Sequence, residues 1–300
     1  MESDLREGEL LMRSEVVVGV AGTPSSEDAV RWGAAAADAR GADLVLVHAV
    51  GLPVAGYEGV WDDAAGQGVA DMLAREAAVA AEGHPDLKVR TEIDMESPGA
   101  ALTRRSETAA LLVVGTRRTT PQHRVFSGSL AYQVVAGSQC PVGVVPPSSR
   151  VPENRVVVGA DGSRDSLAAV RAAAREADRT GAVLHVVHAW KEPTVLASVG
   201  WVPPELPSSV KDEERVVLAE STAGLAEDYP DLEVERTLVE ADPASALLAA
   251  AATARLLVVG SHGRGGVARM LLGSVSHAMV LHAPCPVLVA RADRTESGAR

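Results

Sequence analysis

Short runs of valine and leucine alternate with longer alanine-rich stretches along most of the chain. The short runs are apolar at successive positions, which is typical of strands buried on both faces of a parallel sheet. The alanine-rich stretches have the length and composition of helices. In the second half of the chain this pattern predicts strands at Val156–Gly159, Val183–Ala189, Leu232–Val239, Leu256–Gly260 and Val287–Ala290, with helices near Asp165–Thr180, Asp212–Asp228, Pro243–Ala254 and Ser274–Ala283.

Residues that begin and end helices agree with this pattern. Gly41 and Gly181 follow predicted helices, where glycine commonly adopts the left-handed conformation. Ser97-Pro98 and Asp242-Pro243 have the order of an N-cap residue followed by proline at the first helical position. Strands alternating with helices predict an α/β fold.

The two halves of the chain repeat one another. EVVVGVAGT, from Glu15, matches RVVVGADGS, from Arg155, and CPVGVV matches CPVLVA. A repeat of this length is a whole domain and not a solenoid unit. We therefore predict two tandem doubly wound, Rossmann-like domains, each a five-stranded parallel sheet with helices on both faces. The expected division is a tail at 1–14, a first domain at 15–147, a linker at 148–154, a second domain at 155–291 and a tail at 292–300.

Composition limits the classes of partner. The 300 residues carry a formal net charge of −12, so a general nucleic-acid or anionic-membrane surface is not expected. The acidic N-terminus does not resemble a signal peptide, and Arg255 interrupts the most apolar stretch. Cys140 and Cys285 occupy matching places in the two halves, which favours buried free thiols over a disulfide. The expected location is cytoplasmic.

Two loops in the second half carry candidate binding chemistry. In open parallel sheets, ligands bind beyond the carboxyl ends of strands, where the winding direction reverses. ADGS follows the first strand of the second copy, and GSHGRGGVARMLLGS follows its fourth strand. Glycines in such a loop permit a positive φ or a close backbone approach. The helix that begins near Ser274 would add N–H groups and hydroxyls suited to phosphate oxygens.

These residues resemble the nucleotide loop of the universal stress protein family. The resemblance rests on the spacing of Gly260, Gly263, Gly273 and Ser274, on VVVGADGS, on HAW after the second strand and on CPVLVA, and it extends over 15–145 and 155–290. It implies an ATP-binding, nucleotide-dependent stress-response regulator with slow or no hydrolysis, with Mg2+ left open as a companion of ATP. It implies no catalytic residue and no metal-ligand set. The implied binding positions are Gly159, Asp161, Ala189, Gly260, His262, Gly263, Arg264, Gly265, Gly273, Ser274, Val275 and Ser276.

The first copy departs from this pattern at two positions. Ala21 stands where the second copy has Asp161, and Arg118 stands where it has Gly263. Arginine would be strained at a position that needs positive φ, yet its side chain could itself contact phosphate. We expect weaker ATP binding in the first copy. Its remaining candidate positions are Gly19, Gly115, Gly128 and Ser129, together with Arg118.

Other interpretations were weighed. No Gly-Lys pair occurs, which excludes a Walker loop, and GRGGVA follows the wrong strand for a dinucleotide-binding motif. DGSRDS weakly resembles the loop of ATP pyrophosphatases, so an ATP-consuming enzyme of related fold is one alternative, and an interaction scaffold without nucleotide is another. His48 and His188 are interpreted as packed strand-end residues. The helix charges within Asp62–Glu82 and Asp212–Asp228 are interpreted as solvated faces.

Self-association is expected at the final strand of each copy. Val142–Val145 and Val287–Ala290 are short and apolar, and edge strands of this kind tend to be paired or covered. In the family this strand commonly pairs domains, so the resemblance implies that the two copies dock face to face and that the chain further forms a homodimer through the terminal strands. The protein partner of such a regulator is not identifiable from the sequence.

Overall fold

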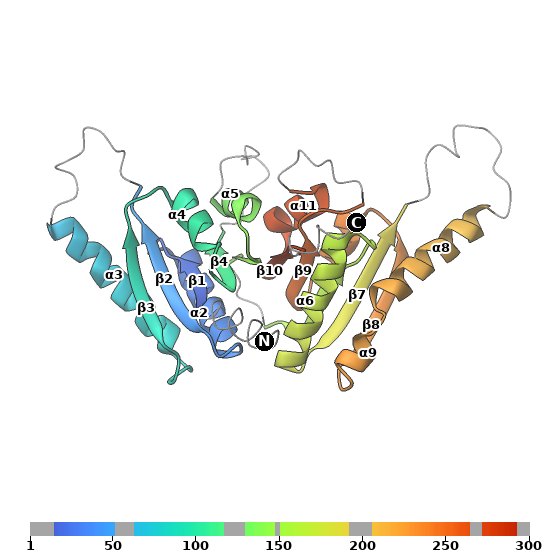
Figure 1. Cartoon of the computed structure of the whole chain (residues 1–300), viewed down its shortest axis with the longest axis horizontal. Coiled ribbons are helices and arrows are strands. Elements are labelled where there is room, and N and C mark those ends of the chain that lie inside the picture. Colours follow the sequence, from blue (N-terminus) through green and yellow to red (C-terminus); the bar gives the residue numbers. More distant parts are fainter. Residues whose placement is uncertain are drawn as a thin grey trace, which may run out of the picture. The chain divides into compact units, whose positions relative to one another are not determined.

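The computed structural model describes residues 15–51, 63–116, 130–147, 151–191, 206–264 and 272–292. The chain divides into two compact units, Met1–Ser149 and Arg150–Arg300 (Figure 1). The first unit contains β1 (Glu15–Gly19), α2 (Pro24–Asp38), β2 (Asp43–Ala49), α3 (Asp63–Ala81), β3 (Val89–Asp94), α4 (Pro98–Arg105), β4 (Leu111–Gly115), α5 (Leu130–Gly137) and β5 (Val142–Val145). The second contains β6 (Glu153–Gly159), α6 (Arg164–Thr180), β7 (Val183–Trp190), α8 (Leu206–Ser221), α9 (Leu225–Asp228), β8 (Val234–Glu240), α10 (Pro243–Ala250), β9 (Ala254–Gly260), α11 (Ser274–His282) and β10 (Val287–Ala290).

The described strands of each unit form a parallel sheet with the same topology. The order is β3-β2-β1-β4-β5 in the first unit and β8-β7-β6-β9-β10 in the second. Helices α2 and α3 cover one face of the first sheet, and α4 and α5 cover the other. Helices α6 and α8, and then α10 and α11, do the same in the second. The predicted fold class, two tandem doubly wound α/β domains, is confirmed.

Local sequence signals set the helix ends, and those at Gly181, Asp242 and Ser97 were predicted. Ser163 is the N-cap of α6, and its side chain accepts a hydrogen bond from the N–H of Ser166. Gly181 ends the same helix with φ of 56°, in the left-handed conformation that glycine adopts without strain. Asp242 caps α10 through the N–H of Ser245, whereas Ser97 caps α4 without a side-chain hydrogen bond.

Two predicted helices are shorter than expected. The single helix predicted over Asp212–Asp228 is two helices, α8 and α9, because Gly224 between them has φ of 81° and breaks the helical path. The helix predicted to run to Ala254 ends at Ala250, and Ala254 already belongs to β9. Alanine favours helix without fixing where it ends, so an alanine-rich boundary is poorly marked in the sequence.

At one helix–strand contact, the large residue lies on the helix in one unit and on the strand in the other. In the first unit Trp32 of α2 packs on Gly143 of β5, where an added Cβ would lie 2.7 Å from the indole ring. The aligned residues of the second unit are Ala172 and Leu288. A bulky residue therefore comes from the helix in one unit and from the strand in the other, which conserves volume in a close-packed core.

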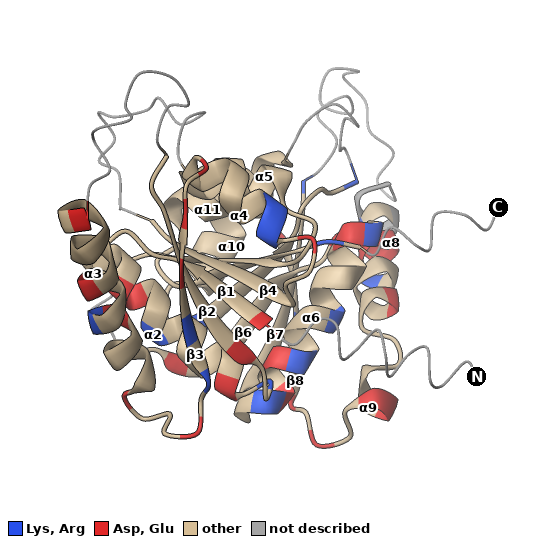
Figure 2. Ribbon diagram, turned by 60° about the vertical axis from the view of Figure 1, so that its left-hand side comes forward, with Lys and Arg blue, Asp and Glu red and all other residues tan. Residues whose placement is uncertain are grey.

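Charged residues gather at the margin of each unit. Figure 2 shows them on α3, α8 and the outer strands β3 and β8, while the middle of each sheet is almost uncharged. Charges along an outer strand discourage pairing with other chains at that edge. Cys140 and Cys285 are buried thiols that form no disulfide, as predicted. None of the helices in the described ranges is long and apolar enough for a bilayer crossing.

Candidate functional site

The candidate site of the second unit lies at the carboxyl ends of β6 and β9. These strands are parallel neighbours, with Val158 beside Val258 near their ends. From β6 the chain winds outward to β7 and β8, and then crosses back to β9 and β10. The winding direction therefore reverses between β6 and β9, where doubly wound sheets bind ligands. The loops that leave these strands, Ala160–Ser163 and 261–264, meet at this point.

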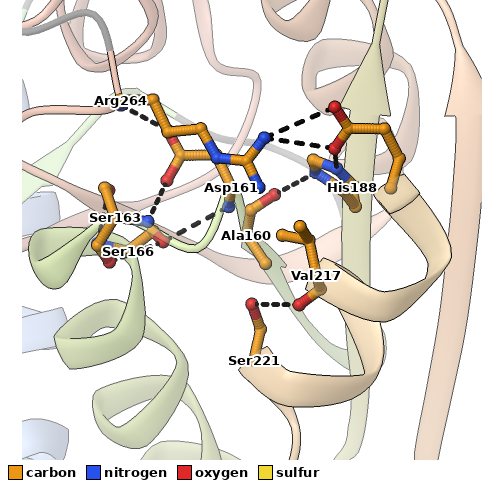
Figure 3. A network of polar contacts seen from close by, with 9 residues as sticks. Ala160, Asp161, Ser163, Ser166, His188, Val217, Ser221 and Arg264 are labelled. Atoms are coloured by element: carbon orange, nitrogen blue, oxygen red, sulfur yellow. Dashed lines mark hydrogen bonds and ion pairs between the residues drawn. The ribbon is translucent and has the colours of Figure 1, made fainter. Parts of the chain in front are cut away.

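The Asp161 carboxylate links the two loops by hydrogen bonds. Its Oδ1 accepts a hydrogen bond of 2.9 Å from the N–H of Ser163, and its Oδ2 accepts one of 2.9 Å from the N–H of Arg264 (Figure 3). Burial by itself raises the pKa of the Asp161 carboxyl, but hydrogen bonds involving Ser163, Arg264 and Ser166 outweigh it and hold that pKa below its ordinary value. Asp161 is therefore an anion at neutral pH, with its negative charge facing the glycine loop.

Asp165 forms a second link, from the first turn of α6. Its Oδ2 accepts hydrogen bonds from Ser261 Oγ at 2.5 Å and from the N–H of His262 at 3.0 Å. The Nδ1 atom of His262 lies 3.3 Å from the same oxygen. The hydroxyl of Ser163 donates to the carbonyl of His262 at 3.4 Å. Two carboxylates from the β6 side thus fix the start of the glycine loop.

The three glycines of this loop that the structure describes are required for close approach and not for positive φ. Gly260, Gly263 and Gly273 are absent from the described glycines with positive φ. A Cβ at Gly260 would lie 2.6 to 2.9 Å from backbone atoms of Asp165 and Ser166, and one at Gly263 would lie 2.5 Å from Asp161 Oδ2. The expectation of backbone strain at the Gly263 position is therefore wrong: the constraint there is steric, and it comes from Asp161.

Several other predicted positions have structural roles. Gly159 and Gly19 lie under leucine side chains of α10 and α4, where a Cβ would come within 2.8 to 2.9 Å of a methyl carbon. Ser276 is buried, and its hydroxyl donates to the carbonyl of Gly260 at 2.5 Å. Ser274 and Val275 form the first turn of α11, and Gly273 caps that helix without a side-chain hydrogen bond. Ala189 is half-buried near the end of β7.

The first unit shares part of this arrangement. Gly115 approaches the backbone of Ser25 as Gly260 approaches Asp165, with a hypothetical Cβ 2.1 Å from the carbonyl oxygen. Ala21 occupies the place of Asp161. The remaining predicted positions, Gly265, Arg118, Gly128 and Ser129, lie outside the described residues.

The sequence did not reveal a buried ionic contact beside the site. Glu214 of α8 lies 2.5 Å from His188 Nε2, and Arg264 Nη1 lies 3.2 Å from the same carboxylate. The prediction that this stretch of α8 is a solvated face is wrong for Glu214. Helical spacing could have indicated that Glu214 faces inward. Leu218 and Ser221, four and seven residues further along, are buried and lie on the same side of α8 as Glu214. His188 is buried, as predicted.

Glu76 of α3 is a buried acid that the sequence analysis placed on a solvated helix face. Its Oε1 accepts a hydrogen bond of 3.3 Å from Ser26 Oγ, and its Oε2 is buried without a partner in the described structure. Burial raises the pKa of the Glu76 carboxyl, and the hydrogen bond from Ser26 lowers it by less. Leu73 and Ala80 are buried on the same side of α3, so helical spacing would have located Glu76 as well.

Within the described ranges, no three His, Cys, Asp or Glu side chains lie close enough together to hold a metal ion. The arrangement is a pair of hydrogen-bonded loops at the switch point of a parallel sheet, with a helix N-terminus and two carboxylates, Asp161 and Asp165, held by hydrogen bonds. Such a combination is suited to a ligand that carries both hydroxyl and phosphate groups.

The fold defines a protein with two doubly wound α/β domains in tandem. The model of the universal stress protein family matches residues 12–146 and 153–291. A universal stress protein of Mycobacterium tuberculosis is 37% identical over 292 residues, covering 92% of this chain and 96% of that protein. One from Mycolicibacterium smegmatis is 37% identical over 293 residues, with the same coverage. The chain belongs to the universal stress protein family.

One solved structure agrees on the fold over nearly the whole chain. A universal stress protein from Archaeoglobus fulgidus covers 93% of this chain and 98% of its own, with a TM-score of 0.67 and 21% identity. A universal stress protein solved in complex with cAMP is 29% identical and covers 47% of this chain and 99% of its own, with a TM-score of 0.35.

Proposed function

We propose that the second domain binds ATP in the crevice between the Ala160–Ser163 loop and the glycine loop. The single observation that carries this proposal is the meeting of the two loops at the switch point, joined by the hydrogen bond from the N–H of Arg264 to Asp161. The adenosine part would lie toward β6 and β7, with Asp161 available to a ribose hydroxyl through its remaining lone pairs. The phosphates would lie at the glycine loop.

The start of α11 supports the phosphate end of this proposal. Its N-cap, Gly273, has no side chain, so it offers no oxygen to the first N–H groups of the helix. Unsatisfied N–H groups and the positive end of the helix dipole favour an anion there. Ser274, the first residue of α11, is exposed and adds a hydroxyl. Mg2+ would accompany the phosphates as part of the ligand.

We propose a regulator that binds nucleotide with slow or no hydrolysis, in preference to an ATP-consuming enzyme. A general base needs a pKa near the working pH and a free lone pair aimed at its substrate. The pKa of Asp161 is lowered, and both of its oxygens accept backbone hydrogen bonds. Asp165 is similarly engaged by Ser261 and His262. Neither carboxylate is suited to proton abstraction.

The test begins with the ligand that the protein carries. Mass spectrometry of nucleotide released from the purified full chain should detect ATP, and calorimetric titration with ATP, with and without Mg2+, should give a micromolar Kd. A turnover assay on the same sample should show hydrolysis much slower than that of a typical enzyme. Absence of ATP binding would favour the scaffold alternative, and rapid turnover would favour the enzyme alternative.

We also propose that the terminal strands mediate self-association. Within its own unit, β5 pairs only with β4, and β10 only with β9, so each is the outermost strand of that unit's sheet. All four residues of each strand are apolar or glycine. Light scattering over a range of concentrations should show a dimer, and a monomer throughout would contradict this.

A further inference from the structure

The side chain of Arg264 turns away from the glycine loop and crosses the loop that follows β6. Its Nη1 lies 3.2 Å from Glu214 Oε2 and 3.4 Å from Glu214 Oε1 (Figure 3). Its Nη2 lies 3.2 Å from the place where a Cβ on Gly162 would be, and Gly162 has φ of 77°. The guanidinium therefore rests over Gly162, between the candidate crevice and α8.

Glu214 is held in place by a different residue, His188. The imidazole of His188 is buried, with Nδ1 2.6 Å from the carbonyl oxygen of Ala160 and Nε2 2.5 Å from Glu214 Oε2. A carbonyl oxygen only accepts, so the network assigns a hydrogen to Nδ1. The Glu214 carboxylate is therefore shared between the His188 imidazole, at 2.5 Å, and the Arg264 guanidinium, at 3.2 Å.

The contact between Arg264 and Glu214 is easily broken. The Arg264 side chain is 44% exposed, and both of its distances to Glu214 exceed 3 Å. Ion pairs of this kind contribute little to stability. A polyphosphate, in contrast, offers arginine several charged oxygens in a geometry that matches its planar fork. The backbone N–H of Arg264 already lies in the crevice, bound to Asp161.

We propose that Glu214, oriented by His188, is a positioning residue that keeps the Arg264 guanidinium beside the crevice until a polyphosphate replaces the carboxylate as its partner. The proposal rests on the nucleotide-binding function proposed above and adds a residue that binds the phosphates and one that competes with them. The arrangement belongs to the second domain. In the first, His48 keeps the corresponding hydrogen bond, 2.8 Å from the carbonyl oxygen of Val20, but Val69 and Thr119 replace Glu214 and Arg264.

The test compares three variants of the full chain by calorimetry with ATP, adenosine and inorganic tripolyphosphate. Glu214→Gln can keep a hydrogen bond to His188, but it lacks the carboxylate that pairs with the Arg264 guanidinium and so releases Arg264. It should bind ATP and tripolyphosphate about two- to fivefold more tightly than the wild type, the size expected for a weak exposed ion pair. Adenosine affinity should not change. Arg264→Gln should weaken ATP binding, and adding Glu214→Gln to it should give no gain.

Glu213→Gln is the matched control, because Glu213 is exposed on the same helix and loses the same formal charge. Unchanged or weaker ATP binding by Glu214→Gln would overturn the proposal, as would a gain that persists without Arg264 or that Glu213→Gln reproduces. None of these results would contradict the proposal that the second domain binds ATP. If the wild type binds tripolyphosphate but not ATP, the proposed function fails while the tripolyphosphate comparison still decides the role of Glu214. If it binds neither ligand, both proposals fail.

Discussion

At the scale of single residues, the two departures of the first repeat are one compensated change. In the second domain, a Cβ at Gly263 would lie 2.5 Å from Asp161 Oδ2. In the first repeat, the pair is Arg118 and Ala21, and alanine carries no carboxylate to obstruct a side chain. The aspartate and glycine of the second repeat thus correspond to an alanine and an arginine in the first. Neither change is understandable without its partner.

This coupling predicts a non-additive pair of substitutions. Gly263→Arg alone should destabilise the second domain by about 1–3 kcal/mol, because the new side chain displaces Asp161 from the N–H of Arg264. The double variant Asp161→Ala with Gly263→Arg should lose much less than the sum of the two single variants. Urea unfolding of the four proteins measures the coupling energy.

Gly260→Ala provides the control for this cycle. Its Cβ would meet the backbone of Asp165 and Ser166, which no side-chain substitution removes, so Asp161→Ala should not rescue it. Strict additivity of Asp161→Ala and Gly263→Arg would show that the carboxylate does not impose the glycine.

At the scale of elements, α3 and α2 share a buried acid whose ionisation opposes folding. Burial raises the pKa of Glu76, so its neutral form is favoured in the folded protein more than in the unfolded chain. The stabilising effect of the protonated group is therefore complete below the ordinary glutamate pKa and is lost as pH rises through the raised value. The aligned residue of α8, Ser221, instead donates to the carbonyl of Val217 at 2.7 Å.

Glu76→Gln should therefore stabilise the first domain at pH 8 by about 1 kcal/mol, the lower end of the cost of an unsatisfied buried group. It should have little effect near pH 4, where the wild-type carboxyl is protonated. Hydrogen exchange of amides in α2 and α3, combined with denaturant unfolding at both pH values, measures the difference. Glu107→Gln, at an exposed site of the same domain, should leave the pH dependence unchanged.

The elements themselves were largely predictable, and the failures have physical causes. Central strands such as Val156–Gly159 are marked by unbroken apolar runs, and α6 is marked at both ends by Ser163 and Gly181. The break at Gly224 was missed because an isolated glycine is often tolerated within a helix. The roles of Gly263 and Glu214 depend on Asp161 and His188, which are distant in sequence. No local pattern distinguishes a glycine required for positive φ from one required because a Cβ would clash with a neighbouring residue.

At the scale of the whole molecule, the repeat places two sites of unequal chemistry in one chain. The second has the anionic Asp161, while the first has Ala21 at the same point. Because Gly263 does not have positive φ, backbone strain is no longer a reason to expect weaker binding in the first domain. The remaining reason to expect weaker binding is that the first domain lacks a carboxylate at the position of Asp161. A hydrogen bond to a charged group contributes roughly 1.5–3 kcal/mol, which corresponds to a tenfold or larger difference in Kd.

We therefore expect one tight and one weaker ATP site in each full-length chain. Calorimetry should resolve one high-affinity equivalent, and the variant Asp161→Ala with Gly263→Arg should abolish it by giving the second domain the pair found in the first. The reciprocal variant, Ala21→Asp with Arg118→Gly, should add a second tight equivalent, because it provides a carboxylate for the ribose and removes the arginine from its place. The same variants should leave the tripolyphosphate affinity of the unaltered domain unchanged. If the wild-type first site instead binds ATP as tightly as the second, and Arg118→Gly alone weakens it, Arg118 is a phosphate ligand and the first domain has exchanged one mode of recognition for another.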